Sequence, residues 1–386
     1  MKPCIAAFAI VVLAMGTALS ACPFCSAPTL TLTEQYAKAD AAVLVQWVGG
    51  EKPEKELAGN TVYEVVQVMR DPQKSLEKGK RITVDRYRAG KKGDLSLLMG
   101  SKGEVLEWGS PLEVTETSFN YVVQAPSPET PSQDVRLGYF LKFLEYPDTT
   151  ISNDAYAEFA NAPYKDIVPL AKQMPRDKLR QWVVSKDVPE SRLGLYGLML
   201  GLCGEPDDAK IMEQKIVQPV EDFRLGIDGV IAGYLLLTGD KGLDLVEKHK
   251  FLDKKVPFSE TYSALQALRF MWTYGDGRIG QDRLRESMRL LLTRPELTDL
   301  VVADLARWKD WSIQKRLMDM YGQEEYNVPS IKRAIIKFMI ASSKDVPAGD
   351  AGKTLPQHAT DGAANLQTLR QKDPKLVQEV ERFYFP

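Results

Sequence analysis

The chain has 386 residues, enough for two or three domains of ordinary size. Hydrophobic residues make up 44% of the chain and charged residues 26%, a composition that excludes a largely disordered protein. The 50 basic and 52 acidic side chains give a net charge of −2, without the basic excess that binding to nucleic-acid phosphates requires. No nucleic-acid partner is therefore expected.

The first 21 residues have the three parts of a secretory signal peptide. Lys2 is their only charge, an apolar run follows over residues 5–15, and small residues dominate 16–21. The run is shorter than the roughly 20 residues that a transmembrane helix needs. We therefore expect an exported protein, located in the periplasm, the cell envelope or the extracellular space, without a transmembrane span.

Two processing routes fit the end of this segment. Ala18 and Ser20 suit an ordinary signal peptidase, which prefers small residues at the third and first positions before the cut. The run Leu19-Ser20-Ala21-Cys22 instead resembles the lipobox of bacterial lipoproteins, whose cysteine receives a lipid. This resemblance makes Cys22 a lipidation candidate and the protein a lipoprotein candidate, anchored to a membrane without crossing it.

Cys22 and Cys25 form a CxxC pair, which can be interpreted in several ways. A thioredoxin-like redox pair lies at a helix N-terminus after a core strand, but only the leader precedes this pair. Haem attachment needs a histidine where Ser26 stands, and a zinc site needs more ligands than Cys4 in the leader and the distant Cys203. A structural disulfide between Cys22 and Cys25 is the simplest interpretation, and Cys203 is expected to be a buried small hydrophobe.

Residues 22–125 show the alternating pattern of a small β domain. A short helix over 33–38, with a threonine N-cap, is expected first. Strands are expected over 42–48, 61–69, 81–85, 95–99, 104–108 and 119–124, the first of them ending at Gly49-Gly50. Short strands at this spacing suggest a partly closed barrel or a meander.

The order of these features resembles the netrin-like, OB-type barrel of the tissue inhibitors of metalloproteinases. The similarity is carried by Cys22 and Cys25 ahead of a helix, by Ala39-Asp40 before the first strand, and by residues 63–65 and 80–84. In that family the free amine of the first cysteine coordinates the zinc of the protease. The resemblance therefore implies an inhibitor of metalloproteases, although those inhibitors carry Cys-x-Cys and several disulfides.

Three prolines within residues 126–132 predict a semi-rigid linker, and helical spacing of apolar residues follows it up to residue 345. The first helices are expected over 135–144 and 152–160. Residues 346–365, rich in Gly, Ala and Pro, are expected to form a flexible tether. A terminal helix is expected over 366–386, broken or kinked by Pro374.

Five of the helices expected within residues 133–345 end at an acidic turn, and these turns recur at intervals of 34 to 36 residues. The acidic residues are Glu205, Asp240, Asp276, Asp310 and Asp345. The positions five and nine residues before each are apolar or aromatic and lie on one helix face. Glycine precedes the first three acidic residues and fits a left-handed C-cap. Such a period predicts an α-solenoid and resembles HEAT-like repeats.

The fold class expected from the sequence is therefore multidomain α+β, with a β-barrel-like OB or netrin-like domain followed by an α-solenoid of HEAT-like helix pairs. No catalytic constellation is visible: His249 lies in a basic stretch, His358 lies in the expected tether, and no phosphate loop, nucleophile elbow or metal-ligand spacing occurs. We expect no enzyme, no cofactor and no metal site.

The expected function is the binding of a protein or peptide partner on the solenoid surface. Arginine and tryptophan dominate interface hot spots, so the interface candidates are Arg269, Trp272, Arg307, Trp308 and Trp311. Trp272 and Trp308 lie on apolar helices, where they could equally belong to the core. The alternative functions are thiol–disulfide redox activity of Cys22 and Cys25, and activity like that of a metalloprotease inhibitor.

Overall fold

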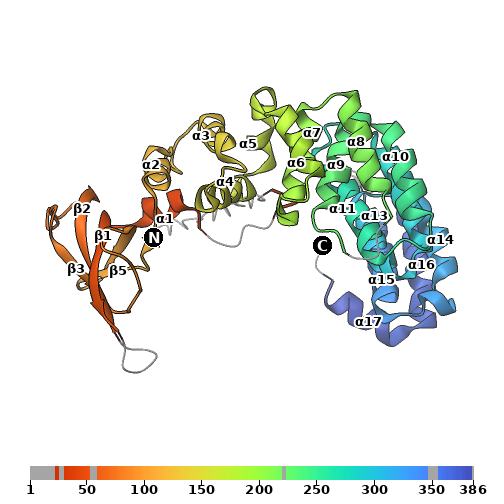
Figure 1. Ribbon diagram of the computed structural model, residues 1–386. Helices are drawn as coiled ribbons and strands as arrows, with labels where there is room; N and C mark the ends of the chain where they lie inside the picture. The colour runs from red at the N-terminus through yellow and green to blue at the C-terminus, as the bar shows by residue number, and fades with distance from the viewer. Residues whose placement is uncertain (1–21, 26–29, 53–58, 220–222, 347–354, 385–386) are drawn as a thin grey trace, which may run out of the picture. The chain divides into compact units, whose positions relative to one another are not determined.

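The computed structural model describes residues 22–25, 30–52, 59–219, 223–346 and 355–384. The chain packs as two compact units, which divide between Leu170 and Ala171 (Figure 1). The expected signal peptide over 1–21 and residues 347–354 of the expected tether lie outside the described residues. The fold class is α+β, with an antiparallel sheet followed by helices whose arrangement is consistent with a helical repeat region.

The first unit contains a six-stranded antiparallel sheet. Its strands are β1 (Ala41–Glu51), β2 (Asn60–Arg70), β3 (Arg81–Val84), β4 (Leu95–Lys102), β5 (Leu106–Trp108) and β6 (Leu112–Glu113). They follow the order β3-β2-β1-β4-β5, and β6 pairs with β4. The sheet is open, because the edge strands β3 and β5 do not pair with each other in the described part of the chain.

One face of the sheet carries the core of this unit. Alternate residues of β1 and β2, including Val43, Val45, Tyr63 and Val65, are buried there together with Leu98. The expectation that the first strand ends at Gly49-Gly50 is wrong, since β1 continues to Glu51. A register shift after Trp47 absorbs the irregularity, and Gly50 fits because a Cβ there would lie 2.5 Å from the Asn60 carbonyl oxygen.

The last expected strand, over 119–124, is instead the helix α2 (Glu116–Gln124). Thr115 caps this helix through a capping box with Ser118, whose amide donates to the Thr115 hydroxyl at 3.1 Å. Phe119 and Val122, one turn apart, are buried together. The cap and this i, i+3 spacing therefore outweigh the β propensity of the segment.

The described residues of the first unit form four further α-helices and two short 3₁₀ segments. They are α1 (Leu32–Lys38), α3 (Gln133–Phe140), η1 (Leu141–Phe143), α4 (Thr149–Asn161), α5 (Tyr164–Ile167) and η2 (Val168–Gln173), the last of which crosses the division between the units. The N-cap of α1 is Thr31, which forms a capping box with Glu34. Asp148 caps α4 by accepting from the amides of Thr150 and Ile151.

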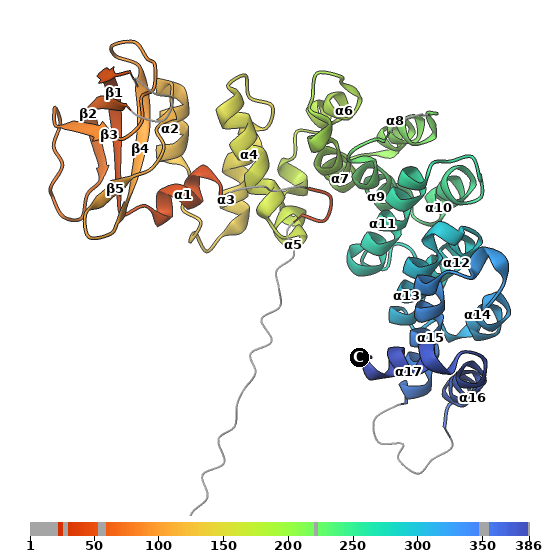
Figure 2. The same ribbon diagram turned by 90° about the horizontal axis from the view of Figure 1, so that it is seen from below.

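The second unit is helical throughout its described residues. Its α-helices are α6 (Arg176–Val184), α7 (Leu193–Cys203), α8 (Pro206–Val217), α9 (Ile227–Thr238), α10 (Asp240–Val246), α11 (Phe258–Tyr274), α12 (Gln281–Leu290), α13 (Thr298–Arg307), α14 (Gln314–Met320), α15 (Pro329–Lys344), α16 (Gln357–Lys372) and α17 (Pro374–Arg382). Shorter segments are η3 (Glu190–Arg192), the π-helical η4 (Glu247–Phe251), η5 (Leu291–Thr293), η6 (Pro295–Leu297), η7 (Trp311–Ile313) and η8 (Glu324–Tyr326). Figure 2 shows α9, α11, α13 and α15 following one another in one row, with α8, α10, α12, α14 and α16 in a second.

The ten apolar positions that the sequence placed before the acidic turns are all buried. The residues five positions earlier are Leu200, Leu235, Met271, Leu305 and Ile340, and those nine positions earlier are Tyr196, Ile231, Ala267, Val301 and Ile336; none is more than 3% exposed. Ion pairs join the helices at the same spacing. The Arg224–Glu260 partners are 36 residues apart and the Arg269–Asp304 partners 35. The register predicted from the sequence is thus also that of the tertiary contacts.

The turns close differently from the expected pattern of left-handed glycines. Gly239 has a φ of 59°, but Gly204 and Gly275 keep negative φ values of −76° and −72°. In the later turns Asp276 and Lys309 take the left-handed conformation, with φ values of 49° and 54°. Gly204 and Gly275 are required for space, because a Cβ at either position would lie 2.4 Å from the carbonyl oxygen four residues earlier.

The end of the chain is more helical than its composition suggested. α16 begins at Gln357, so residues 357–365 of the expected tether are helical. The reason is tertiary packing, since α16 buries Ala359, Leu366 and Leu369 and approaches α15 closely at Gly362. The prediction that Pro374 interrupts the terminal helix is confirmed, because α17 starts at this proline.

Helices α7 and α9 come into backbone contact through glycines. A Cβ on Gly201 would lie 2.3 Å from the Cα of Gly233, and one on Gly233 would lie 2.0 Å from the Gly197 carbonyl oxygen. Gly229 is equally tight against Gly194. These residues allow two uniformly apolar helices to approach more closely than any residue with a side chain would permit.

We predict that Gly233→Ala lowers the free energy of unfolding of the second unit by about 2–3 kcal/mol, because the added methyl group forces α7 and α9 apart. Urea denaturation of the full chain measures this effect. The matched control is Gly280→Ala, where a Cβ would meet nothing within 4 Å. Equal denaturation midpoints for the two variants would contradict the prediction.

Candidate functional site

A groove of about 620 Å³ lies between α13 and α15 in the second unit. Its lining residues are Asp299, Ala303, Ala306, Arg307, Ser330, Arg333, Ala334, Lys337, Phe338, Ala341 and Tyr384. On α15 the small residues Ser330, Ala334 and Ala341 recur at helical spacing. This stripe lies apart from the buried positions Ile336 and Ile340, so one face of the helix packs into the unit and another borders the groove.

The groove combines an apolar floor with a basic rim. Alanine side chains leave the space that larger residues would fill, and Tyr384 adds aromatic surface, whereas Phe338, which also borders the groove, is itself buried. Arg307, Arg333 and Lys337 are its basic lining residues and Asp299 its acidic one; Arg307 pairs with Asp304 at 2.8 Å and Arg333 with Glu379 at 3.0 Å. Lys337 is exposed and has no ion-pair partner among the described residues. The groove therefore favours a ligand with bulky apolar groups and negative charge.

Of the five interface candidates, only Arg307 lines this groove. Its side chain is 70% exposed and pairs with Asp304 at 2.8 Å. Arg269 binds the other oxygen of the same carboxylate at 2.7 Å from the neighbouring helix α11. Asp304 is thus a buried carboxylate that fixes Arg269 and positions Arg307.

Trp272 and Trp308 stack on each other rather than facing a partner. Their ring centroids are 4.3 Å apart and the planes differ by 7°. Trp308 is only 4% exposed. Arg285 lies over the Trp272 ring at 5.2 Å and donates to the Trp308 carbonyl oxygen at 2.6 Å. The pair is a packing element between α11 and α13.

Trp311 is half-buried and bound to Asp345 at the end of α15. Its indole Nε1 donates to Asp345 Oδ2 at 2.8 Å, and Lys309 binds the other carboxylate oxygen at 2.5 Å. Because of Lys309, Trp311 and other neighbours, the pKa of Asp345 is lowered even though burial opposes the shift. His358 stacks on Trp311 with ring centroids 5.9 Å apart, so this histidine has a packing role.

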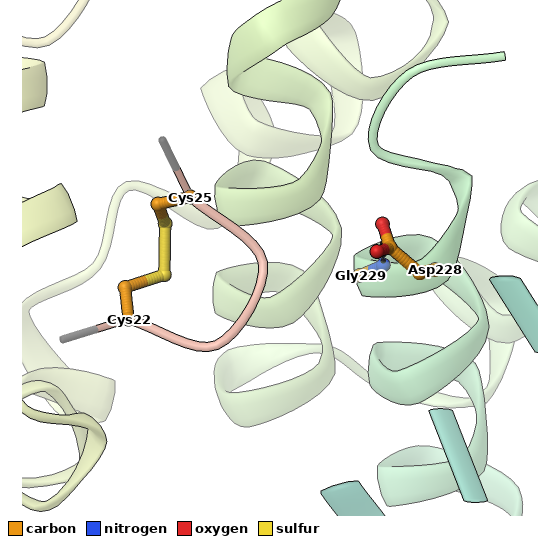
Figure 3. The surroundings of a disulfide bond; sticks show 4 residues. All are labelled: Cys22, Cys25, Asp228 and Gly229. Carbon is orange, nitrogen blue, oxygen red and sulfur yellow. Dashed lines mark hydrogen bonds between the residues drawn. A yellow bond between two sulfur atoms is a disulfide. The ribbon is translucent and has the colours of Figure 1, made fainter. Parts of the chain in front are cut away.

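Cys22 and Cys25 form the expected disulfide (Figure 3). Cys22 is buried and its amide donates to the carbonyl oxygen of Ala160, the penultimate residue of α4, at 3.2 Å. No helix begins at the pair, since α1 starts at Leu32. Cys203 is half-buried rather than buried, and burial raises the pKa of its thiol to about 11, which leaves it protonated and unreactive near neutral pH.

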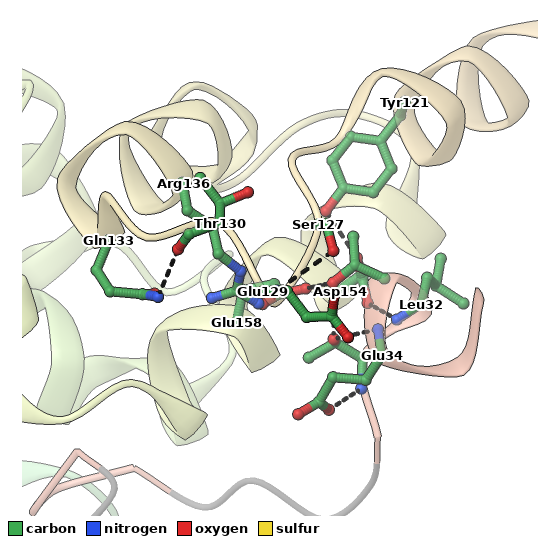
Figure 4. Close-up of polar contacts among 12 residues, drawn as sticks. Leu32, Glu34, Tyr121, Ser127, Glu129, Thr130, Gln133, Arg136, Asp154 and Glu158 are labelled. Atoms are coloured by element: carbon green, nitrogen blue, oxygen red, sulfur yellow. Dashed lines mark hydrogen bonds and ion pairs between the residues drawn. The ribbon is translucent and has the colours of Figure 1, made fainter. Parts of the chain in front are cut away.

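Two buried carboxylates on α4 hold the residues that follow the disulfide (Figure 4). Asp154 accepts hydrogen bonds from the Leu32 amide at 2.7 Å and from the Tyr121 hydroxyl at 2.8 Å. Glu158, one turn later, accepts from the Thr33 hydroxyl and pairs with Arg136. Asp154 and Glu158 therefore connect α1, α2 and α3 to α4.

This arrangement raises the pKa of both carboxyl groups. Burial is the largest cause for Asp154, whose pKa rises to about 6, and the nearby Glu158 adds to the rise. Burial also raises the pKa of Glu158, against the opposing effect of Arg136. Perturbed carboxyl pairs can mark acid–base catalysis, but here every carboxylate oxygen faces a donor from the same unit. The contacts of Asp154 and Glu158 are therefore those of a structural pair.

The sequence did not single out the groove, the Asp154–Glu158 pair or the disulfide contact with α4. The one available signal for the groove was the recurrence of small residues on α15, beside its apolar stripe. Within the described residues, no group of three or more His, Cys, Asp and Glu side chains is placed to hold a metal ion. None of the helices described is both long and apolar enough to cross a bilayer.

No protein-family model matches the chain, and no curated protein matches it either. The groove and the buried network therefore have to be interpreted from their own chemistry.

We predict that Asp154 makes the first unit less stable as the pH rises. Its folded pKa of about 6 lies above the ordinary 3.8, so its contribution is complete below pH 3.8 and is lost as the pH rises through 6. The full difference corresponds to about 3 kcal/mol. Asp154→Asn should flatten the dependence between pH 4 and 7.

Urea denaturation across this pH range, followed by hydrogen exchange in peptides from α1 and α4, measures the effect. The matched control is Glu116→Gln, which removes an exposed carboxylate from the start of α2. An unchanged pH dependence in Asp154→Asn would show that this carboxyl group does not titrate as described.

Proposed function

We propose that the protein is an exported, non-catalytic interaction protein whose helical repeats bind an acidic peptide segment of a partner protein. The groove between α13 and α15 carries the proposal. Its alanine floor offers space for bulky apolar side chains, and Lys337, which has no ion-pair partner among the described residues, offers charge complementarity to a carboxylate beside the paired Arg307 and Arg333. Extended binding surfaces of this kind are characteristic of stacked helix pairs.

The proposal includes the finer fold assignments. HEAT-like repeats over residues 133–345 are supported by the buried apolar columns and by ion pairs whose partners are 35 or 36 residues apart. A netrin-like, OB-type origin of the sheet is supported by its strand order, in which β1 pairs with both β2 and β4. An OB-type barrel in which β3 and β5 were not paired would have the order β3-β2-β1-β4-β5 that is observed here.

The two alternative functions have weaker support in the geometry. An inhibitor of the metalloprotease type would present the amine of its first cysteine, whereas the Cys22 nitrogen is bound to Ala160 and the residue is buried. A redox pair would gain reactivity from a helix N-terminus, whereas α1 begins seven residues after Cys25. The cysteines therefore suit a structural disulfide, which an oxidising compartment permits.

We predict that the full chain selects, from a random peptide library, sequences in which bulky apolar residues are flanked by Asp or Glu. Ala334→Leu fills the groove floor and should weaken binding of a selected peptide at least tenfold, about 1.4 kcal/mol. Fluorescence anisotropy measures the affinity.

The control is Ala364→Leu, the same change at an exposed position of α16 away from the groove. Lys337→Glu tests the charge component separately and should weaken acidic peptides more than neutral ones. Peptides that bind both alanine variants as tightly as the wild type would refute the groove as the binding site.

We further predict that the exported chain begins at Ala21, after the ordinary signal-peptidase cut that Ala18 and Ser20 suit, and carries the Cys22–Cys25 disulfide without a lipid. Intact-mass spectrometry with thiol alkylation before and after reduction tests this prediction: alkylation should label both cysteines only after reduction. A lipid mass on Cys22 would contradict it, because a thioether at Cys22 leaves Cys25 without its disulfide partner. Retention of residues 1–20 would contradict export by a cleaved signal peptide.

A further inference from the structure

A second cleft, of about 470 Å³, lies in the first unit on the core face of the sheet. β1, β2, β4 and β6 form its floor, and the first residues of α2 and the N-cap of α4 border it. Its lining residues are Trp47, Tyr63, Arg88, Ala89, Gly90, Asp94, Leu95, Ser96, Glu113, Val114, Thr115, Ser118, Asp148 and Thr150. This volume is within the range of small-molecule sites.

The wall of the cleft is held in place before any ligand binds. Trp47 and Tyr63 are directly paired across β1 and β2, so their side chains share one face of the sheet. The Trp47 indole donates to the Arg88 carbonyl oxygen at 3.0 Å, and the Trp47 amide donates to the Asp94 carbonyl oxygen at 2.8 Å. Gly90 lies against the same ring, where a Cβ would be 2.8 Å from it. The loop that carries Arg88 is therefore fastened to the sheet.

Three polar side chains in this cleft have no partner within the described parts of the chain. The first is Tyr63, which is 2% exposed and whose hydroxyl makes no hydrogen bond there. The second is Arg88, which uses its backbone but not its guanidinium. The third is Glu113, whose backbone pairs with Ser96 while its carboxylate has no donor. Tyr63 is buried, Arg88 is half-buried and Glu113 is exposed, so a phenol and two opposite charges in the lining of one cleft are open to a ligand.

Arg88 and Glu113 carry opposite charges but form no ion pair with each other within the described residues. Both act on the same phenol: burial raises the pKa of Tyr63, Arg88 lowers it and Glu113 raises it further. The two charges therefore both lie near the Tyr63 phenol, in the lining of the same cleft. A ligand bound there can meet a cation and an anion at once.

We propose that this cleft binds a free α-amino acid. The ligand carboxylate pairs with the Arg88 guanidinium and accepts from the Tyr63 hydroxyl, and its ammonium group donates to Glu113. Trp47, Leu95 and Val114 provide apolar surface for the side chain. A purely anionic ligand would be repelled by Glu113, and also by Asp94 and Asp148 at the border. A purely cationic ligand would leave Arg88 unpaired.

Isothermal titration of the full chain with the common L-amino acids tests the proposal, and the best binder then serves as the probe. Its amide lacks the carboxylate and its N-acetyl derivative lacks the ammonium group, so each should bind at least tenfold more weakly. Arg88→Gln should abolish the discrimination against the amide, and Glu113→Gln the discrimination against the N-acetyl derivative. Tyr63→Phe should weaken the unmodified amino acid while leaving near-ultraviolet circular dichroism unchanged.

The control is Arg86→Gln, an exposed arginine of the same loop that does not line the cleft; this variant should bind like the wild type. Saturable binding that follows this pattern supports the proposal. The absence of saturable heat with every amino acid would overturn it, as would equal binding of the probe and its two derivatives, or unchanged affinity in both Arg88→Gln and Glu113→Gln. None of these results depends on the groove between α13 and α15.

Discussion

Helices of the second unit bury their apolar faces by packing against helices about 35 residues away in the chain. No helix of this length can bury an apolar stripe by itself, so each depends on its neighbours for stability. The buried columns that include Leu200, Leu235 and Leu305 are the result of this constraint. Buried carboxylates reinforce the same spacing, because Glu260 and Asp304 are each held by an arginine about one period earlier. Removing one member of such a pair would leave a buried charge without a partner.

The same constraint leaves the opposite faces of these helices without a packing role. α13 buries Val301 and Leu305 while Ala303 and Ala306 border the groove, and α15 divides its faces in the same way. Small residues on such a free face create space, and long basic residues at its margins define the charge of what can fill it. Residues on the face that borders the groove can therefore be substituted without disturbing the buried core.

The first unit contains two groups of polar side chains with different surroundings. Asp154 and Glu158 are buried, but each oxygen has a donor, so the network joins the N-terminal segment to α4. Tyr63, Arg88 and Glu113 have no such partners and line open space. The raised pKa values alone would have marked Asp154 and Glu158 as the candidate site. Their hydrogen bonds within the unit show that they are structural, whereas the residues that line the cleft lack such partners.

The local sequence pattern was sufficient to predict an element where a single interaction determines it. The alternation in β2 reflects burial of one sheet face, and the disulfide follows from two cysteines three residues apart. It was insufficient for α2, where a capping box outweighed β propensity, and for α16, where packing against α15 orders residues that composition assigned to a tether. The groove and the cleft were not predictable in detail, because residues such as Ala303 and Ala334 or Tyr63 and Glu113 are far apart in the chain.

The two kinds of structure and the period of the helices could be predicted from the residue pattern, because side-chain burial repeats every second residue in a strand and about every 3.6 residues in a helix. Which polar groups find partners depends on the folded chain, because hydrogen bonds and ion pairs need short distances between segments that no local pattern encodes. Asp154 and Glu113 are both acidic residues beside apolar ones in the sequence. Folding gives the first two donors and leaves the second with none in the described chain.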